Sequence, residues 1–319
     1  GATTRYSSSQ AADAMGFLAM AGLRVNEILG AMPGTLQLAA SANLDLARSA
    51  DIVTNILTGY GLAVEELGRA NDVLVKTFTR TNVDLSMLGE SFKYAGPVAK
   101  SAGVAFEEAA AAIGLMGNAG IQGSMAGTAL RGAITRLLKP TAEVARTLNR
   151  LGVQVTDSEG RLLSLVEIVR QLEEAGATTG DMMTIFGQRA GPAMAALVDQ
   201  GSDALRSLVR ELETAGGTAK RIADVQMRGF RGALLELRSA IEALALAITG
   251  TGLLDGMTAL TKEVAATVRA VAGLPRPVLL AGAAIAGLVA AIGPLLIVGA
   301  KLIALFLQAK ILLAAVGVG

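Results

Sequence analysis

The chain has 319 residues, enough for two domains, and 52% of them are apolar but only 3% aromatic, so aliphatic side chains supply nearly all of the hydrophobicity. The 28 Lys and Arg residues nearly balance the 27 Asp and Glu residues, which excludes the basic footprint of a nucleic-acid-binding protein. Cys and His are both absent, which excludes a disulfide framework, a thiolate nucleophile and the commonest metal ligand and general base.

Helical periodicity begins close to the N-terminus. The first ten residues lack the basic and apolar blocks of a secretory signal and begin with Gly1, so we expect the chain to be a piece of a longer protein. Apolar residues three and four apart then predict a helix over 10–34, closed by Pro33 and Gly34. The same spacing predicts helices over 35–61 and 65–82.

The next helices are bounded by prolines and glycines. They are predicted over 84–96, stopped by Pro97, over 106–120, over 123–139, stopped by Pro140, and over 141–152. Residues 153–163 break the pattern, because Val153 and Val155 alternate with other residues and 157–160 has the sequence of a type I turn. We expect a small surface hairpin there, with no chemistry.

Helices resume over 164–176 and 180–201, and a longer run starts at Ala223. Its apolar residues are spaced four and three apart for about three and a half heptads, which is near the minimum for a coiled coil. After Ala223, this heptad seam consists of Met227, Phe230, Leu234, Leu237, Ile241, Leu244 and Ile248. A single long helix lying on a globular core explains the spacing equally well. A further amphipathic helix is predicted over 251–273.

The segment 278–300 contains no charged residue. As a helix of about 23 residues it is roughly 34 Å long, slightly more than the ~30 Å hydrocarbon thickness of a bilayer. Its branched aliphatic residues give insertion a preference on the order of −5 kcal/mol. The residues predicted to span the membrane are Val278, Leu279, Leu280, Ile285, Leu288, Val289, Ile292, Leu295, Leu296, Ile297 and Val298.

Small residues recur at every fourth position of this segment, a spacing that lets helices pack closely in lipid and predicts self-association. This small face consists of Gly282, Ala283, Ala286, Gly287, Ala290 and Ala291. Lys301 and Lys310 interrupt the apolar run that follows, which suits a second, shorter span or an interfacial helix. A buried helical hairpin within a large soluble assembly is the alternative that fits the same composition.

No group of residues predicts catalysis, a cofactor or a metal site. The adjacent acids 65–66, 107–108 and 173–174 point about 100° apart on a helix, so we expect solvated faces and not acid and base pairs. The glycines between 117 and 127 follow neither the dinucleotide-binding pattern nor the P-loop pattern.

Several motifs follow one another in a specific order. Residues 88–140 read LGESFKYAGPVAKSAGVAFEEAAAAIGLMGNAGIQGSMAGTALRGAITRLLKP, and LGVQVTDSEGRL, LVEIVRQL and IFGQRAGPAMAALV follow downstream. This series, together with residues 14–57 and 66–82 upstream, resembles bacteriophage tail tape-measure proteins. The resemblance covers roughly residues 10–250, and its specificity lies in the order of the motifs.

The resemblance implies a non-enzymatic protein that fills the lumen of the tail tube in the virion and sets tail length during assembly. A helical chain gains about 1.5 Å per residue, so residue count becomes a ruler. It also implies release on infection, followed by formation of a channel for DNA across the host cell membrane. The implied partners are other copies of the chain, with a trimer expected, tail tube and tail tip proteins, assembly chaperones and the host membrane, but no specific nucleic-acid sequence.

We therefore expect an all-α chain with three parts. These are a helical core over 1–215, long amphipathic or coiled-coil helices over 216–273, and an apolar, membrane-spanning helix or helical hairpin over 274–319. Each glycine inside a helix costs roughly 0.5–1 kcal/mol relative to alanine, which favours a fold that can rearrange. A bacterial pore-forming toxin or effector with a shielded apolar hairpin is the alternative function.

Overall fold

The computed structural model describes residue 6 and residues 8–227, which lie in one compact unit. Within this range every regular element is a helix, which confirms the all-α prediction for this part of the chain. The elements are α1 (Ser8–Met20), α2 (Val25–Ala42), α3 (Leu46–Tyr60), the 3-10 helix η1 (Val64–Glu66), α4 (Leu67–Arg80), α5 (Leu85–Ser101), α6 (Phe106–Asn118), α7 (Ser124–Leu138), α8 (Ala142–Leu151), α9 (Leu165–Glu174), α10 (Thr179–Gln200), α11 (Ser202–Glu213) and α12 (Thr218–Met227).

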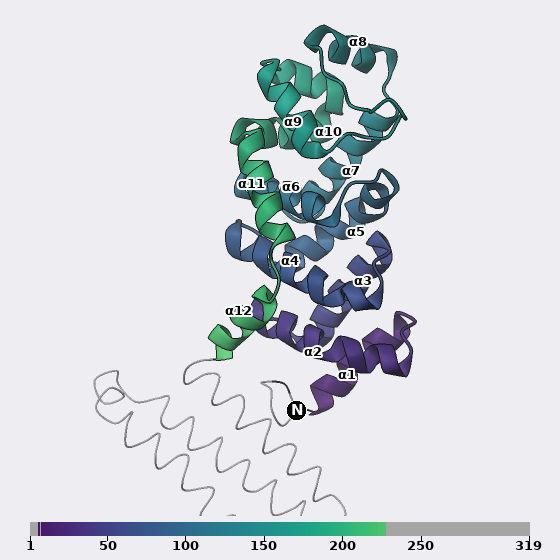
Figure 1. The fold of residues 1–319 in the computed structure, drawn as a ribbon, viewed down its shortest axis with the longest axis vertical. Coiled ribbons are helices and arrows are strands. Elements are labelled where there is room, and N and C mark those ends of the chain that lie inside the picture. Colours follow the sequence, from purple (N-terminus) through teal and green to yellow (C-terminus); the bar gives the residue numbers. More distant parts are fainter. Residues whose placement is uncertain (1–5, 7, 228–319) are drawn as a thin grey trace, which may run out of the picture. The chain divides into compact units, whose positions relative to one another are not determined.

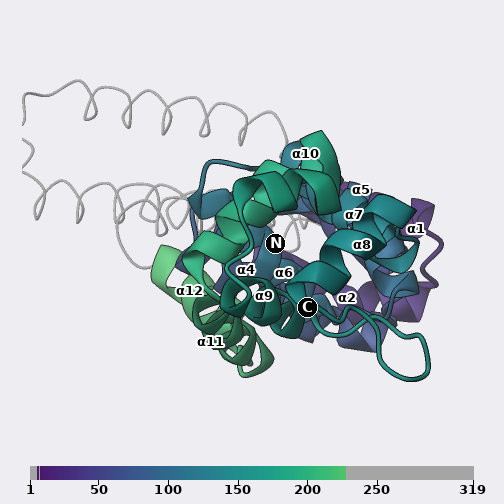
Figure 2. The ribbon, with the colours of Figure 1, turned by 90° about the horizontal axis from the view of Figure 1, so that it is seen from above.

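The helices form two layers, and the chain alternates between them (Figure 1). In the first layer α1, α3, α5, α7 and α10 pack successively against one another, and in the second layer α2 packs on α4, α4 on α6, and α6 on α9. The chain then runs back over the second layer, because α11 packs across α4, α6 and α9, and α12 packs across α2 and α4. Figure 2 shows α11 and α12 on the side of α4, away from α5 and α7.

The centre of this arrangement is α6, which is buried around its whole circumference from Phe106 to Gly117. A helix that is apolar on all sides belongs in the interior of a protein. At its start, the rings of Tyr60, Phe92 and Phe106 pack with centroids 4.9–5.9 Å apart and join α3, α5 and α6. The Tyr60 hydroxyl donates to the Val104 carbonyl oxygen over 2.6 Å. These three aromatic residues therefore hold three helices together at one junction.

The first two helices do not divide as predicted. The prediction that Pro33 and Gly34 close the first helix is wrong, because α1 ends at Met20, Gly22 turns the chain at a φ of 90°, and Pro33 lies inside α2. The predicted helix over 35–61 is also divided, since Asn43 adopts a left-handed conformation with φ 51° and ends α2. The side chain of Asp45 then accepts a hydrogen bond from the Arg48 amide over 3.0 Å and begins α3.

Pro97 likewise does not end its helix, because α5 continues to Ser101. Pro33 and Pro97 both lie at exposed positions, and so do Leu29 and Lys93, the residues four positions earlier whose carbonyl oxygens lose a helical partner. The opposite face of α5, with Phe92 and Ala99, is buried and holds the helix in place. Packing of that face outweighs the local cost of the proline.

The predicted hairpin over 153–163 is confirmed. Thr156 and Leu162 form an isolated antiparallel bridge, and the Leu163 amide donates to the Val155 carbonyl oxygen over 2.9 Å. The turn is closed by the Gly160 amide, which donates to the Asp157 carbonyl oxygen over 3.1 Å. Gly160 has a φ of 79°, a conformation that favours glycine.

Candidate functional site

The glycine-rich connection between α6 and α7 brings α7 against the backbone of α5. Gly120 and Gly123 have φ values of 80° and 56°, which favour glycine. The Ser91 hydroxyl of α5 donates to the Gly123 carbonyl oxygen over 2.8 Å. A Cβ atom added at Gly127 would lie 2.2 Å from the Ser91 carbonyl oxygen, so the two helices approach this closely only because Gly127 has no side chain. These glycines therefore provide a turn and a tight helix contact.

A second glycine shapes the motif IFGQRAGPAMAALV. Gly187 has φ 77° and ψ 172°, and it kinks α10 into two helical pieces. The guanidinium of Arg136, on α7, occupies the space beside it and donates to the Thr184 carbonyl oxygen over 3.3 Å. Arg136 thus donates a hydrogen bond from another helix to the backbone beside the kink. Both glycine contacts join α7 to its neighbours in the first layer.

The expectation that Glu107 and Glu108 lie on a solvated face is wrong, because their residues are only 9% and 6% exposed. Glu107 forms an ion pair with Arg69, which joins α6 to α4. The Glu108 carboxylate accepts a hydrogen bond from the Val166 amide over 3.0 Å, at the first turn of α9. Burial raises the pKa of Glu108 above its ordinary value, while hydrogen bonds from the α9 backbone act in the opposite direction.

These partners are distant in sequence, since Arg69 is 38 residues from Glu107 and Val166 is 58 residues from Glu108. The signal that the sequence did contain is the run of small and apolar residues that follows the two acids. A helix buried on every side leaves its acids no solvated face, so both need partners within the protein. The other two acidic pairs, 65–66 and 173–174, lie at exposed or half-exposed positions as predicted.

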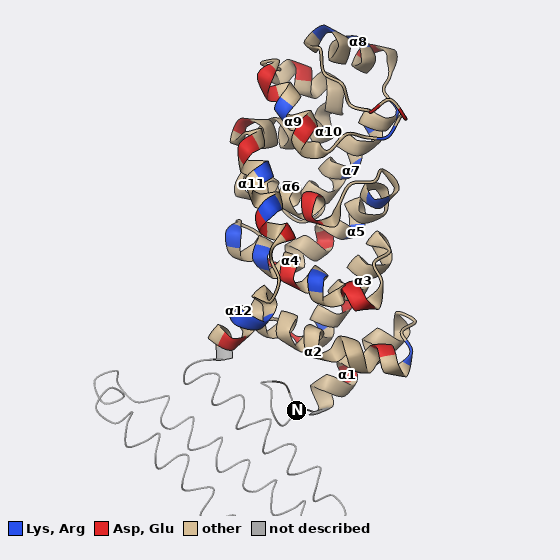
Figure 3. Ribbon diagram, viewed as in Figure 1, with Lys and Arg blue, Asp and Glu red and all other residues tan. Residues whose placement is uncertain are grey.

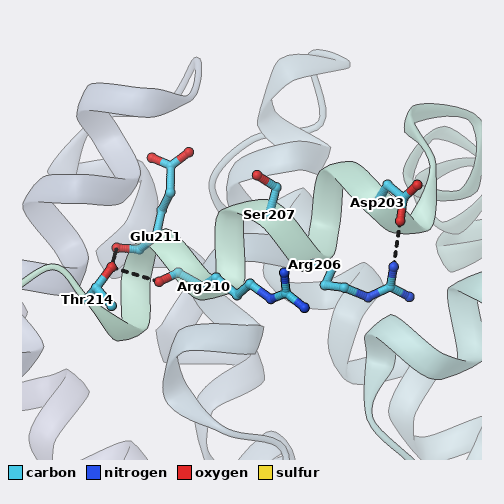
Figure 4. A pocket seen from close by; sticks show the side chains of 6 residues that line it. All are labelled: Asp203, Arg206, Ser207, Arg210, Glu211 and Thr214. Atoms are coloured by element: carbon cyan, nitrogen blue, oxygen red, sulfur yellow. Dashed lines mark hydrogen bonds and ion pairs between the residues drawn. The ribbon is translucent and has the colours of Figure 1, made fainter.

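Charges of both signs are interspersed over the described helices (Figure 3). The surface of α11 carries a shallow, charged depression. Figure 4 shows the residues that line it, which are Asp203, Arg206, Ser207, Arg210, Glu211 and Thr214. Arg206 pairs with Asp203 over 2.5 Å, and Glu211 pairs with Arg80 of α4 over 2.7 Å. The hydrogen bond from Arg80 lowers the pKa of Glu211. The ion pair of Glu211 with Arg80 joins α11 to α4. Exposed ion pairs of this kind contribute about 0–1 kcal/mol each to stability.

The described residues offer no grouping for metal chemistry. No three His, Cys, Asp or Glu side chains gather there closely enough to hold a metal ion. The features that stand out are contacts between helices, namely the tight glycine contact at Ser91, the capped kink at Gly187 and the buried acids of α6. These contacts fix the positions of the helices relative to one another.

Most predicted site residues lie outside the described range. Met227 is the last residue of α12, and the rest of the heptad seam follows it. The predicted spanning segment 278–300 and its small face also lie outside the described residues. Of the helices over residues 8–227, none has the length and apolar character needed to cross a membrane. The seam, the spanning segment and the division into 1–215, 216–273 and 274–319 stay predictions.

Comparison with known proteins gives a consistent result. The family model described as phage-related minor tail protein matches residues 1–188. The chain is 35% identical, over 98% of its length, to the tape measure protein of Pneumococcus phage Dp-1, of which it covers 28%. It is 31% identical, over 80% of its length, to the probable tape measure protein of Escherichia phage P2, of which it covers 32%. No solved structure matches the chain.

The match to the family model includes both layers of helices from α1 into α10. The chain spans about a third or less of the length of the two curated relatives. Because the family model covers more than half of the chain, and the two relatives agree with it, the chain belongs to the family of phage-related minor tail proteins, as the order of its motifs predicted.

Proposed function

We propose that the chain is a segment of a phage tail tape-measure protein, located in the lumen of the tail tube. The observation that carries this proposal is the 35% identity to a protein named tape measure protein, because it extends over 98% of the chain. The all-helical character of the described residues supports the proposal, since helices gain a fixed length per residue. The proposal includes no enzymatic activity, and a zymogram with peptidoglycan should therefore show no clearing.

The layered fold bears on how such a ruler would work. A single helix of about 30 residues is roughly 45 Å long. Two such helices packed side by side have axes only about 8–10 Å apart. Each helix added to a layer therefore lengthens the stack of helices by much less than its own length. We infer that long helices such as the one predicted over 223–248 carry the measurement, while residues 8–227 in their layered form carry much less of it.

Tail length tests this proposal directly. Deleting the codons for 223–248 from the parent gene should give virions with shorter tails in electron micrographs. A deletion of equal length in the helices over 142–176 that leaves assembly intact should shorten the tail less. Tails of unchanged length after the first deletion would overturn the ruler function.

We further propose that the segment from Val278 onward enters the host membrane after release and contributes to a channel for DNA. The absence of charge over 278–300 supports this proposal. When the full chain is mixed with liposomes, detergent and not high salt should extract it. Recovery of all of the protein in the salt wash would overturn the membrane function. The small face predicts that the segment associates with itself in lipid. The proposed partners of the chain are other copies of it, tail tube and tail tip proteins, and assembly chaperones.

The alternative of a pore-forming toxin has no observation of its own in support. The family match over residues 1–188 covers the helical layers that a toxin would use as a shield. We therefore favour the tail function.

A further inference from the structure

The charged side chains of the described helices are unevenly paired. On α4, α9 and α11, most cations lie within ion-pair distance of a carboxylate; these are Arg69, Lys76, Arg80, Arg170 and Arg206. By contrast, no cation of α5, α7 or α10, nor the lysine directly after α7, forms an ion pair with any described residue. These cations all occupy exposed positions and are Lys93, Lys100, Arg131, Arg136, Lys139 and Arg189.

Neighbouring helices of the first layer bring some of these cations together. The guanidinium carbon of Arg131, on α7, is 5.9 Å from the centre of the Tyr94 ring, on α5. A Cβ atom added at Gly132 would lie 3.6 Å from the Cβ of Ala190, so α10 adjoins α7 beside Arg131. The residue before Tyr94 and the residue before Ala190 are also cations. The resulting row across α5, α7 and α10, which we call the basic row, consists of Lys93, Arg131 and Arg189.

The acids of the same helices do not neutralise the basic row. Glu90 lies about one turn before Lys93, but its carboxylate is 3.9 Å from the Arg48 guanidinium of α3. Asp181 forms its ion pair with Arg150 of α8. Asp199 is ten residues beyond Arg189, which is about 15 Å along a helix. The basic row therefore keeps a net positive charge, although the totals of acids and bases in the whole chain are nearly equal.

The composition of the surface around the basic row favours a polyanion over an ordinary protein partner. Protein interfaces are centred on buried apolar and aromatic anchors. The exposed apolar residues of α7, Met125 and Leu138, lie at the two ends of that helix, and the guanidinium of Arg131 lies over the ring of Tyr94. Contacts to nucleic-acid phosphates are made instead by Arg and Lys, together with hydroxyl groups such as that of Thr128.

We propose that the basic row binds the phosphate backbone of double-stranded DNA, and that Lys100, Arg136 and Lys139 add to its positive potential. Helices packed in one layer have axes about 8–10 Å apart, and a DNA duplex carries a negative charge about every 1.7 Å of its axis, so the cations meet phosphates in many registers. Such binding is independent of base sequence, because phosphates carry no sequence information. The overall charge balance excludes a basic footprint of the whole chain but not of one face. The proposal goes beyond the tape-measure function and does not depend on it.

Salt-dependent DNA binding tests the proposal. The fluorescence anisotropy of a labelled duplex of about 30 base pairs is measured as the full chain is added, between about 50 and 200 mM NaCl. The logarithm of the association constant should fall with the logarithm of the salt concentration with a slope of about −3, since each phosphate contact contributes about −0.9. Two duplexes of different base sequence should bind with affinities that agree within about twofold. Absence of binding at the lowest salt concentration would overturn the proposal.

A variant of the basic row distinguishes this face from the charge of the whole chain. Lys93→Gln, Arg131→Gln and Arg189→Gln combined should weaken binding at least about tenfold at the lowest salt concentration and reduce the magnitude of the slope by about 2–3. Circular dichroism establishes that the variant is folded. Unchanged affinity in the folded variant would overturn the proposal.

The matched control removes the same charge from α4, α9 and α11. It combines Arg80→Gln, Arg170→Gln and Arg206→Gln, whose positive charges already pair with carboxylates. Its affinity for DNA should stay within about twofold of the natural chain, because exposed ion pairs contribute little to stability and leave little free charge. Equal losses in the two variants would show that only net charge matters, which also overturns the proposal.

An acidic polypeptide is the other kind of partner that fits a row of cations. Polyglutamate has a lower charge density than duplex DNA, so it should displace the labelled duplex only at a concentration of charge at least about tenfold higher. Displacement at an equal concentration of charge would assign the basic row to an acidic protein and overturn its assignment to DNA.

Discussion

The contact between α5 and α7 gives the sharpest prediction of stability. A Cβ atom added by Gly127→Ala would lie 2.2 Å from the Ser91 carbonyl oxygen, whereas ordinary contacts begin near 3.4 Å. The two helices must therefore separate by about 1 Å, which costs about 1–3 kcal/mol as overpacking. The same shift weakens the 2.8 Å hydrogen bond from Ser91 to Gly123, which adds about 0.5–1.5 kcal/mol.

Alanine has a better helix propensity than glycine, which returns about 0.5–1 kcal/mol. We therefore expect Gly127→Ala to lower the free energy of unfolding by about 0.5–4 kcal/mol, and to lower the urea midpoint by on the order of 1 M. Urea denaturation followed by circular dichroism measures this change.

Gly132→Ala is the matched control, because it lies in the same helix and its added Cβ atom would meet only the Cβ of Ala190, at 3.6 Å. It should raise the free energy of unfolding by about 0.5–1 kcal/mol. If Gly127→Ala is as stable as Gly132→Ala, the close approach of α5 and α7 is refuted.

Three further predictions concern single positions and use the same denaturation assay. Gly187→Ala should destabilise the protein by about 1–3 kcal/mol, because φ 77° and ψ 172° are accessible almost only to glycine, and an unchanged midpoint would argue against the kink. Asn71 is 1% exposed, and neither its Oδ1 nor its Nδ2 has a hydrogen-bond partner among the described residues. Asn71→Leu should therefore stabilise the protein by about 1–3 kcal/mol. A loss of stability would show that the side-chain amide of Asn71 is hydrogen-bonded. The folded-state pKa of Glu108 is raised, so its favourable contribution to stability is complete below the ordinary carboxyl pKa and is lost as pH rises through the folded-state pKa. Glu108→Gln should therefore gain stability relative to the natural chain between pH 4 and pH 8. A stability difference that does not change with pH would contradict this.

Most of the helices could be predicted from the sequence, because their apolar residues follow the helical period and most boundaries carry local signals. The helix α11, over Ser202–Glu213, was not predicted. The hairpin was predictable for the same reason, since Asp157 and Gly160 occupy turn positions that depend only on local geometry. The errors at Pro33 and Pro97 arise because the rule that proline ends a helix holds for an isolated segment. Both prolines lie on an exposed face, and burial of the opposite face decides the outcome.

The contacts of the candidate site were less accessible to sequence analysis. The pairing of Glu107 with Arg69 and of Glu108 with Val166 depends on how α6 lies between α4 and α9. Nothing local to either acid specifies that arrangement. The glycine at 127 was visible as part of a glycine-rich stretch, but only the position of Ser91 shows that the missing side chain permits a backbone contact.

The central claim, that the chain belongs to a ruler, is tested most directly by tail length per inserted residue. Heptads copied from the seam are inserted after Ile248 in the parent gene, and the tails of the resulting virions are measured by electron microscopy. If the inserted residues extend one helix, about 28 of them should lengthen the tail by roughly 42 Å, in proportion to the number inserted. Infectious virions whose tails keep their original length at every insertion size would contradict the claim.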